Sequence, residues 1–531
     1  MSGVKLLDCT LRDGGYINQW NFGRKAIRDI LFGLSVSRMD IIECGFLKAG
    51  AYDPDFSLFG SAQDAGAVLD AHGSLYVSMI AIGEMELDPA LLRDAAQGPI
   101  DGVRLTFHQH EADKAFDYGK TLLRKGYKLF MQPVGTTNYT DGQMIELIHR
   151  INELKPYAFY MVDTLGMMYT KDLIRQFYLL DHNLDPGIRA GYHSHNNLQM
   201  AFANAQALIE AGSGRELIID CSCSGMGRGA GNLCTELMMD YMNRFHGARY
   251  DVLPVLEIID QYLIPILISA PWGYSPAYYL AAANRCHPNY ASFLLTNHSM
   301  NIRTIASVLD QIEPEKRRYF DKNLIEALYR AYQDNAVDDI GVIGALRQRI
   351  EGREILVVAP GQSVVNQTEK IARYIEKKNP FVIAVNFIPS QAAPLEADLI
   401  FVCNNRRYEE IAEALDPRMA VFTSNIKNAP ASAALVNYSD LTNPSPDASD
   451  SAGIMILKLL MKLGAEKAAL AGYDGFSRNQ ANNFALKSMA GLSDPGALEE
   501  KNRAIGEQLN ICAQKLDLKF ITPTRYRIKR K

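Results

Sequence analysis

The sequence predicts an α/β protein whose N-terminal part is a (β/α)8 TIM barrel. From residue 4 to about residue 240, short apolar runs alternate with amphipathic stretches of helical period. Strict alternation of strands and helices is typical of a parallel sheet. Eight such units over roughly 240 residues match the size of a closed barrel. The same pattern is also compatible with an open, doubly wound sheet, which is the alternative fold.

Eight segments carry the strand pattern of the barrel, which we expect to span residues 1–250. Each is followed by a stretch of helical period, such as residues 25–36 or 141–154. The predicted strands are Val4–Cys9, Met39–Gly45, Leu75–Ile82, Gly102–Phe107, Tyr127–Gln132, Ala158–Asp163, Ile188–His193 and Leu217–Cys221.

Two further regions follow the barrel. Residues 251–350 lack strand signals and show helical periodicity, so we expect a helical extension that completes the active site. Over residues 351–531 apolar runs and helical stretches alternate again, which predicts a Rossmann-like α/β domain. Its expected strands are Ile355–Ala359, Phe381–Phe387, Leu399–Cys403, Met419–Thr423 and Lys467–Ala471.

Composition and charge restrict the functional classes. With 48% hydrophobic and 22% charged residues, the chain has the composition of a soluble globular protein. A net charge of −5 is too mild to indicate nucleic acid or an anionic membrane as the main partner. No apolar stretch reaches the roughly 18 residues that a membrane span needs. We expect a cytoplasmic protein with reduced cysteines, no nucleic-acid partner and no membrane span, and we also expect a homo-oligomer.

Polar residues gather where the predicted barrel strands end. The active site of a (β/α)8 barrel lies at the C-terminal ends of its strands. Random placement would scatter polar residues over both rims. Here they collect at one rim, at Arg12, Asp13, Glu43, Arg104, His108, Asp163, Thr164, His193, His195 and the glycine-rich run 225–232.

Asp13, His193 and His195 form the strongest combination for metal binding. Alternate residues of a strand point the same way, so the two imidazoles can face one point. A carboxylate from the first strand completes a mixed oxygen and nitrogen site. This donor set suits Mn²⁺ or Mg²⁺ with positions open for substrate oxygens. The alternative is two histidines satisfied by hydrogen bonds, and the companion carboxylate favours the metal site.

Two neighbouring features fit the chemistry of such a site. Arg12 and the metal would together stabilise the oxyanion of an enolate formed next to a 2-oxo acid, whereas the alternative for Arg12 is a structural ion pair. The glycine-rich run allows close backbone approach to a ligand, and its amides can meet a carboxylate or a phosphate. It follows the eighth strand, where barrels often bind phosphate.

Three motifs, in this order, resemble those of the family often called DRE-TIM metallolyases. They are Asp8–Gly14, His193–Asn196 and Gly229–Leu233, and the resemblance spans about residues 1–245. The family includes 3-hydroxy-3-methylglutaryl-CoA lyase, isopropylmalate and homocitrate synthases, and 4-hydroxy-2-oxovalerate aldolase. The resemblance implies that Asp13, His193 and His195 bind the metal with Asn232 near or on it. It also implies that Arg12 polarises the oxo group, and we expect Glu43, Arg104 and Gly229 in the substrate pocket.

Among these branches the sequence is most similar to the aldolase. Residues 103–113 resemble its fourth-strand segment, and residues 289–295 resemble a segment whose tyrosine reaches back into the site. Tyr290 is therefore a candidate acid/base or orienting residue, and the alternative is a tyrosine packed between helices. Tyr16 stands where the aldolases place the histidine that serves as base. Either its pKa is lowered, or another residue such as His108 takes the role, or the substrate differs.

The C-terminal unit loosely resembles the nucleotide-binding domains of certain bacterial sialyltransferase-like and pterin-pyrophosphokinase-like proteins. The resemblance implies a nucleotide or nucleotide sugar bound at Gly361, Ser363, Asn386, Gly453 and Asp474. The three spaced glycines of a dinucleotide site are missing, so nicotinamide binding is not expected. The alternative is a degenerate α/β domain used for assembly or regulation.

These observations predict a lyase, a divalent-metal aldolase that cleaves or forms a C–C bond next to a 2-oxo acid through a pyruvate-type enolate. A Claisen-type, acyl-CoA-dependent synthase on the same barrel is one alternative. A nucleotide- or carbohydrate-binding protein with a vestigial barrel is another. The intact set of Asp13, His193 and His195 argues against the latter.

Overall fold

The computed structural model describes residues 3–69, 73–298, 300–443, 445, 448–477, 482–489 and 495–528. The chain forms two compact units, Met1–Asn289 and Tyr290–Lys531. The boundary falls inside the predicted helical extension of residues 251–350, so that stretch is divided between the units. Within the described ranges, no helix is both long enough and apolar enough to cross a membrane.

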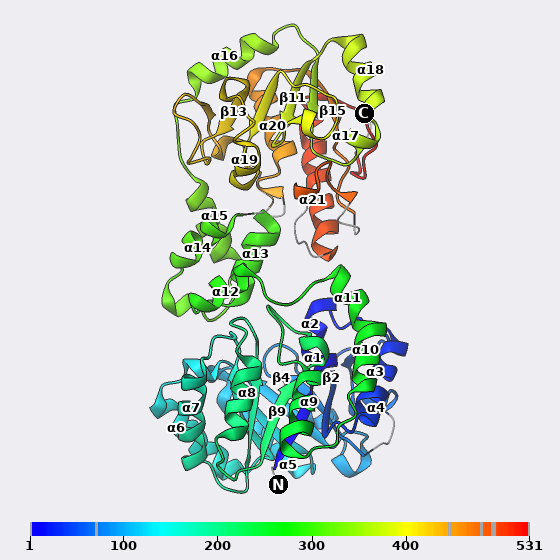
Figure 1. Cartoon of the computed structure of the whole chain (residues 1–531), viewed down its shortest axis with the longest axis vertical. Coiled ribbons are helices and arrows are strands. Elements are labelled where there is room, and N and C mark those ends of the chain that lie inside the picture. The colour runs from blue at the N-terminus through cyan, green and yellow to red at the C-terminus, as the bar shows by residue number, and fades with distance from the viewer. Residues whose placement is uncertain are drawn as a thin grey trace. The chain divides into compact units, whose positions relative to one another are not determined.

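Eight parallel strands close the barrel of the first unit (Figure 1). β1 pairs with β9 on one side and with β2 on the other, and the order between them is β9-β8-β7-β6-β5-β4-β2. All eight predicted barrel strands are confirmed, with ends that differ by two residues at most. The strands are β1 (Val4–Asp8), β2 (Ile41–Leu47), β4 (Leu75–Ala81), β5 (Gly102–Phe107), β6 (Lys128–Pro133), β7 (Ala158–Asp163), β8 (Arg189–Ser194) and β9 (Leu217–Cys221), with the unpredicted short β3 (Leu58–Phe59) beside β2.

Helices cover the outside of this sheet. They are α1 (Thr10–Asp13), α2 (Gly15–Asn18), α3 (Arg24–Val36), α4 (Ala62–Gly66), α5 (Ala112–Arg124), α6 (Asp141–Leu154), α7 (Thr170–Asn183), α8 (Ala201–Glu210) and α9 (Thr235–His246). After them come α10 (Leu253–Ile258), the π-helical turn Ile259–Leu263, α11 (Ile264–Ser269) and α12 (Pro276–Ala283). The prediction of a helix after every strand is wrong between β4 and β5. Two 3₁₀ turns stand there, because Pro89 and Pro99 bring no amide hydrogen to a helix.

The strand period of two gives the barrel an inner and an outer face. Alternate strand residues pack outward against the helices in the main core. Inward-facing side chains form a separate apolar layer inside the barrel: Leu7, Cys9, Ile41, Val77, Phe130, Ala158, Tyr160, Val162 and Ile218. Two positions further along their strands, Ile41, Phe130 and Ile218 are followed by Glu43, Gln132 and Asp220. A polar layer therefore lies above the apolar one, at the C-terminal ends of the strands.

The second unit is an all-parallel sheet of order β14-β13-β12-β11-β10-β15-β16. Its strands are β10 (Ile355–Val358), β11 (Phe381–Val385), β12 (Leu399–Val402), β13 (Ala420–Thr423), β14 (Ala434–Val436), β15 (Lys467–Ala471) and β16 (Asp517–Phe520). The five predicted strands are confirmed, and β14 and β16 were not predicted. Neighbouring residues such as Val357 and Val358 belong to different apolar clusters, so both faces of the sheet are covered.

Helices of the second unit precede the sheet and connect its strands (Figure 1). They are α13 (Pro288–His298, which crosses the unit boundary), α14 (Ile302–Asp310), α15 (Lys322–Gln333), α16 (Ile340–Ile350), α17 (Ser363–Asn366), α18 (Thr368–Lys378), α19 (Asn405–Ile411), α20 (Ala452–Leu463) and α21 (Pro495–Cys512). The strand order reverses between β10 and β15. Ligands of open α/β sheets bind at such a reversal.

Candidate metal centre

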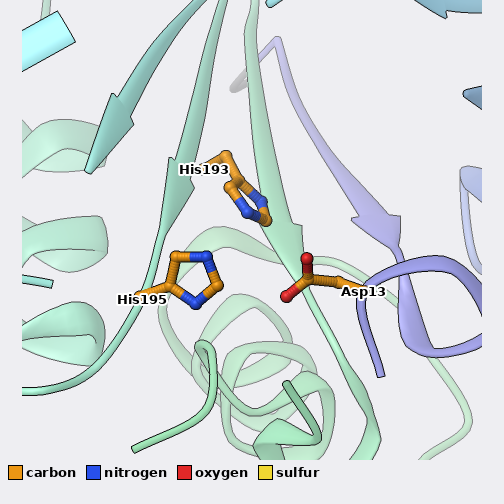
Figure 2. Close-up of side chains that lie close together, drawn as sticks. All are labelled: Asp13, His193 and His195. Carbon is orange, nitrogen blue, oxygen red and sulfur yellow. The ribbon is translucent and has the colours of Figure 1, made fainter. Parts of the chain in front are cut away.

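Asp13, His193 and His195 come together at the C-terminal rim of the barrel (Figure 2). One ligand atom of each lies within 4.8 Å of the others, and all three side chains are buried. Bonds of about 2.1 Å to one divalent ion are then within reach of small side-chain movements. His193 ends β8 and His195 follows it, while Asp13 ends the short α1 after β1. The structure therefore brings the predicted ligands together as a buried set suited to a divalent cation.

The surroundings of both histidines prepare them to act as ligands. His193 donates its Nδ1 hydrogen to Asp220 over 3.0 Å, which turns Nε2 toward the centre. Burial lowers the pKa of His195 to about 4, so its imidazole is neutral near pH 7. Burial raises the pKa of Asp13, but Arg12 and the two histidines outweigh it and hold that pKa well below its usual range. The set offers one carboxylate and two imidazoles.

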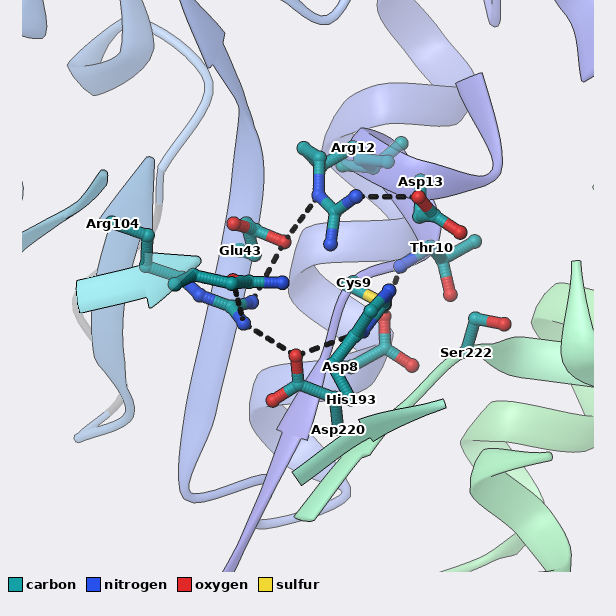
Figure 3. A network of polar contacts seen from close by, with 12 residues as sticks. Asp8, Cys9, Thr10, Arg12, Asp13, Glu43, Arg104, His193, Asp220 and Ser222 are labelled. Atoms are coloured by element: carbon teal, nitrogen blue, oxygen red, sulfur yellow. Dashed lines mark hydrogen bonds and ion pairs between the residues drawn. The ribbon is translucent and has the colours of Figure 1, made fainter. Parts of the chain in front are cut away.

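A chain of buried ion pairs supports these ligands from inside the barrel (Figure 3). Arg12 donates through Nε to Glu43 over 2.8 Å and through Nη1 to Asp13. Arg104 donates to Glu43 over 3.0 Å and also to Asp220. The network therefore holds two guanidinium groups and three carboxylates, an excess of one negative charge. Because an uncompensated buried charge is costly, this excess favours a bound cation.

Arg12 and Glu43 each keep one polar atom free. Arg12 Nη2 and Glu43 Oε1 are buried and have no hydrogen-bond partner among the described residues. Unpaired buried polar atoms are rare in folded proteins and often mark a place where a ligand binds. The free donor of Arg12 belongs to the guanidinium group that also pairs with Asp13.

Asn232 lies against the metal carboxylate. Its Nδ2 donates to Asp13 Oδ2 over 2.7 Å, and its Oδ1 is buried without a partner in the described chain. The loop requires glycine at residue 227, because a Cβ there would lie 2.4 Å from Asn232 Nδ2 and 2.9 Å from Asp13 Oδ2. The close approach of this loop thus positions the amide that orients Asp13.

Comparisons with known proteins agree with this geometry. Residues 110–256 match the model of the HMGL-like family. The chain is 26% identical over 305 residues to the 4-hydroxy-2-oxovalerate aldolase of Roseiflexus castenholzii, covering 56% of this chain and 86% of that one. It is 27% identical to the same-named protein of Moorella thermoacetica, covering 50% and 78%.

A solved structure, the HMG-CoA lyase of Bacillus subtilis, covers 50% of this chain and 93% of its own at 15% identity, with a TM-score of 0.41.

Tyr16 lies close enough to the centre to feel the charges of Arg12 and Asp13. Its ring packs edge-on against Trp20 at 4.7 Å between centroids. Burial raises the pKa of Tyr16, and this outweighs the opposing charges of Arg228 and Arg12. That shift is opposite to the one a tyrosine base needs, and the role of Tyr16 in catalysis stays a prediction. The phenol is protonated at neutral pH and is suited to donate a hydrogen bond.

The remaining predicted residues of the aldolase site lie in different surroundings. Arg104 is completely buried and serves the ion-pair network. His108 follows β5, with its Nε2 3.7 Å from Glu84 Oε1. Tyr290 opens the second unit, where its hydroxyl is hydrogen-bonded to the backbone of Lys316, Tyr319 and Asp321. The roles of His108 and Tyr290 in catalysis stay predictions.

Gly229 lies within the rim loop in a left-handed conformation with φ +65°. A Cβ there would lie 2.6 Å from Asn197 Oδ1, which also accepts the amide of Ala230 over 2.8 Å. Asn197 in turn donates to Leu165 O over 2.9 Å. The glycine is therefore required for the close packing of the loop, and its contact with substrate stays a prediction.

In the second unit, the predicted nucleotide-binding residues contact one another or the sheet. Asp474 accepts hydrogen bonds from the amide and hydroxyl of Ser363 at the reversal between β10 and β15. A Cβ at Gly361 would lie 2.6 Å from Asp474, so that turn closes over the carboxylate. Asn386 binds the amide of Cys403, and Gly453 accepts from Tyr473. The carboxylate of Asp474 thus occupies this turn, and nucleotide binding stays a prediction.

Sequence reasoning missed Asp220 and Gln132. Asp220 interrupts the apolar run Leu217–Cys221, and a charged residue inside such a strand is rarely buried unless it is paired. Gln132 ends a predicted strand and accepts from Arg104 over 2.6 Å. Both share the inward face of the barrel with Glu43, which the period of two would have indicated.

Proposed function

We propose that the barrel is a divalent-metal-dependent aldolase that cleaves or forms a C–C bond next to a 2-oxo acid, as in 4-hydroxy-2-oxovalerate aldolase. The observation that carries the proposal is the free Nη2 of Arg12, buried beside Asp13, His193 and His195. Cleavage breaks the C3–C4 bond of a 4-hydroxy-2-oxo acid and leaves its electron pair on the pyruvate enolate. A donor aimed at that oxygen is worth most in a buried site.

Asp13, His193 and His195 would hold the ion, and Mn²⁺ or Mg²⁺ suits their donor set. A divalent ion there supplies Lewis acidity toward the oxygens of the 2-oxo acid. Arg12 holds the same end of the substrate, while Glu43 and Arg104 keep its guanidinium in place. A base near the rim takes the proton of the C4 hydroxyl, and His108 is the candidate for it.

A Claisen-type synthase on the same barrel needs the same enolate and an acyl-CoA partner. The curated relatives named above are called aldolases, which favours the aldol reaction. A vestigial barrel that only binds ligands is disfavoured by the buried, fully assembled ligand set.

Solvent deuterium exchange into the methyl group of pyruvate tests the proposal without knowledge of the aldehyde. The full-length protein should exchange with Mn²⁺ present and not with a chelator. His193→Ala should lose both bound metal and exchange. The matched control is His149→Ala, which removes an exposed histidine of α6. Wild-type protein that holds no more Mn²⁺ than His193→Ala, or that fails to exchange, would refute the proposal.

A further inference from the structure

Arg228 of the glycine-rich rim loop is an unused cation beside the metal centre. Its guanidinium carbon lies 3.4 Å from the centroid of the Tyr16 ring, so the two groups stack. The side chain is half-buried. In the part of the chain that the structure describes, no carboxylate forms an ion pair with it. A stacked guanidinium keeps the N–H groups of its edge available for an oxygen ligand.

Titratable groups from several elements feel the charge of Arg228. One of them is the acid Glu84, whose pKa is lowered first by its hydrogen bond with His108 and also by the charges of Arg228 and His287. Glu84 is 62% exposed and is shared with His108. The charge of Arg228 also acts on His195 and His287 and disfavours the protonated form of each.

The loop that carries Arg228 is held in one conformation. The amide of Gly231 donates to Arg228 O over 3.0 Å, and that of Ala230 donates to Asn197. The amides of residues 227, 228 and 229 have no acceptor in the described chain. An anion held by the guanidinium can therefore also meet backbone donors that need no rearrangement.

We propose that Arg228 binds a second anionic group of the substrate, a carboxylate or a phosphate on the aldehyde-derived half. This inference rests on the proposed function. The 2-oxo acid half already has Arg12 and the metal ligands, so Arg228 is surplus to it. Arg228 stacks on Tyr16, the position where the resemblance expects the aldolase histidine. A changed residue at that position together with an added cation indicates a different aldehyde partner.

Matched acceptors test the inference in aldol additions of pyruvate by the Mn²⁺-loaded, full-length protein. One pair is succinic semialdehyde and pentanal, and the other is glyceraldehyde 3-phosphate and glyceraldehyde. Wild type should prefer one charged member by about ten- to a hundredfold in kcat/KM, the value of one charge-assisted hydrogen-bonded contact. The pair with the larger preference identifies the anion as carboxylate or phosphate.

Arg228→Leu should abolish that preference. Arg228→Lys should keep part of it, because lysine retains the positive charge but lacks the paired N–H donors of a guanidinium group. Pyruvate deuterium exchange should stay near the wild-type rate in both variants. The control is Arg244→Leu, which removes an exposed arginine of α9 and should change neither quantity. A preference that persists in Arg228→Leu would overturn the inference.

A binding measurement keeps the inference testable without turnover. Calorimetry should show that 2-oxoadipate binds the wild-type protein about tenfold more tightly than 2-oxohexanoate does. In Arg228→Leu the two acids should bind with equal affinity. Equal affinities in wild type, including no binding of either acid, would overturn the inference. Pyruvate exchange reports separately on the proposed function, so wild-type protein that exchanges pyruvate but shows no preference for the charged acid refutes only the role of Arg228.

Discussion

Replacing Asp220 by asparagine separates support of the metal ligands from support of the fold. Asp220 accepts from His193 Nδ1 over 3.0 Å and from Arg104, and it is 2% exposed. Asparagine keeps the volume and one acceptor oxygen but removes the charge. The buried network then holds two guanidinium groups and two carboxylates. Its excess negative charge is gone, and His193 loses the group that fixes its tautomer.

The loss should appear chiefly in metal affinity. Carboxylates that orient a ligating histidine change affinity by about ten- to a hundredfold when mutated. That range corresponds to about 1.4–2.7 kcal/mol. Without metal, the unfolding free energy of Asp220→Asn should fall by less than the roughly 3–5 kcal/mol that breaking a buried ion pair costs, because Glu43 still pairs with Arg104. The variant should therefore be destabilised more with Mn²⁺ than without it.

Calorimetric titration with Mn²⁺ and thermal unfolding with and without the metal measure the two effects. The control is Asp181→Asn, which breaks the Asp181–Arg215 pair of 2.6 Å elsewhere in the barrel. It should lower stability to the same extent with and without Mn²⁺ and leave the affinity unchanged. If Asp220→Asn binds Mn²⁺ as tightly as wild type, Asp220 does not prepare His193 for metal binding.

Three further changes have expected outcomes. Gly227→Ala should weaken Mn²⁺ binding, since its Cβ would lie 2.9 Å from Asp13 Oδ2, and an unchanged titration curve would contradict this. Tyr16→Phe should keep every inflection that the wild-type pH–rate profile of 4-hydroxy-2-oxo acid cleavage shows below pH 9. The reason is that burial raises the pKa of Tyr16, so its phenol does not titrate in that range. Gly472→Ala should lower the unfolding free energy of the second unit by about 1–3 kcal/mol or more, since φ is +74° and the Cβ would meet Ala359 O. The control Gly464→Ala, at φ +85° in open space, should cost less in the same thermal melts.

The barrel and its metal ligands were predictable because both depend on local periodicity. Alternating strands and helices specify a parallel sheet, and the spacing of His193 and His195 puts them near one rim. The missing helix between β4 and β5 could also have been predicted, because Pro89 and Pro99 stand in that segment. In the second unit, the short strands β14 and β16 were missed, since runs of three or four residues carry little pattern.

What only the tertiary structure decided is how distant side chains share the inside of the barrel. Asp220 and Arg104 lie 116 residues apart in sequence, and Arg104 and Glu43 lie 61 apart. No local pattern pairs them, because their contact depends on closure of the sheet and on the stagger of its strands. Closure also buries Tyr16, raises its pKa and places Arg228 on its ring. The sequence by itself determined the fold and the buried Asp, His and His set that could hold a metal. The packing around them decided which polar groups are already paired and which are free to bind a substrate.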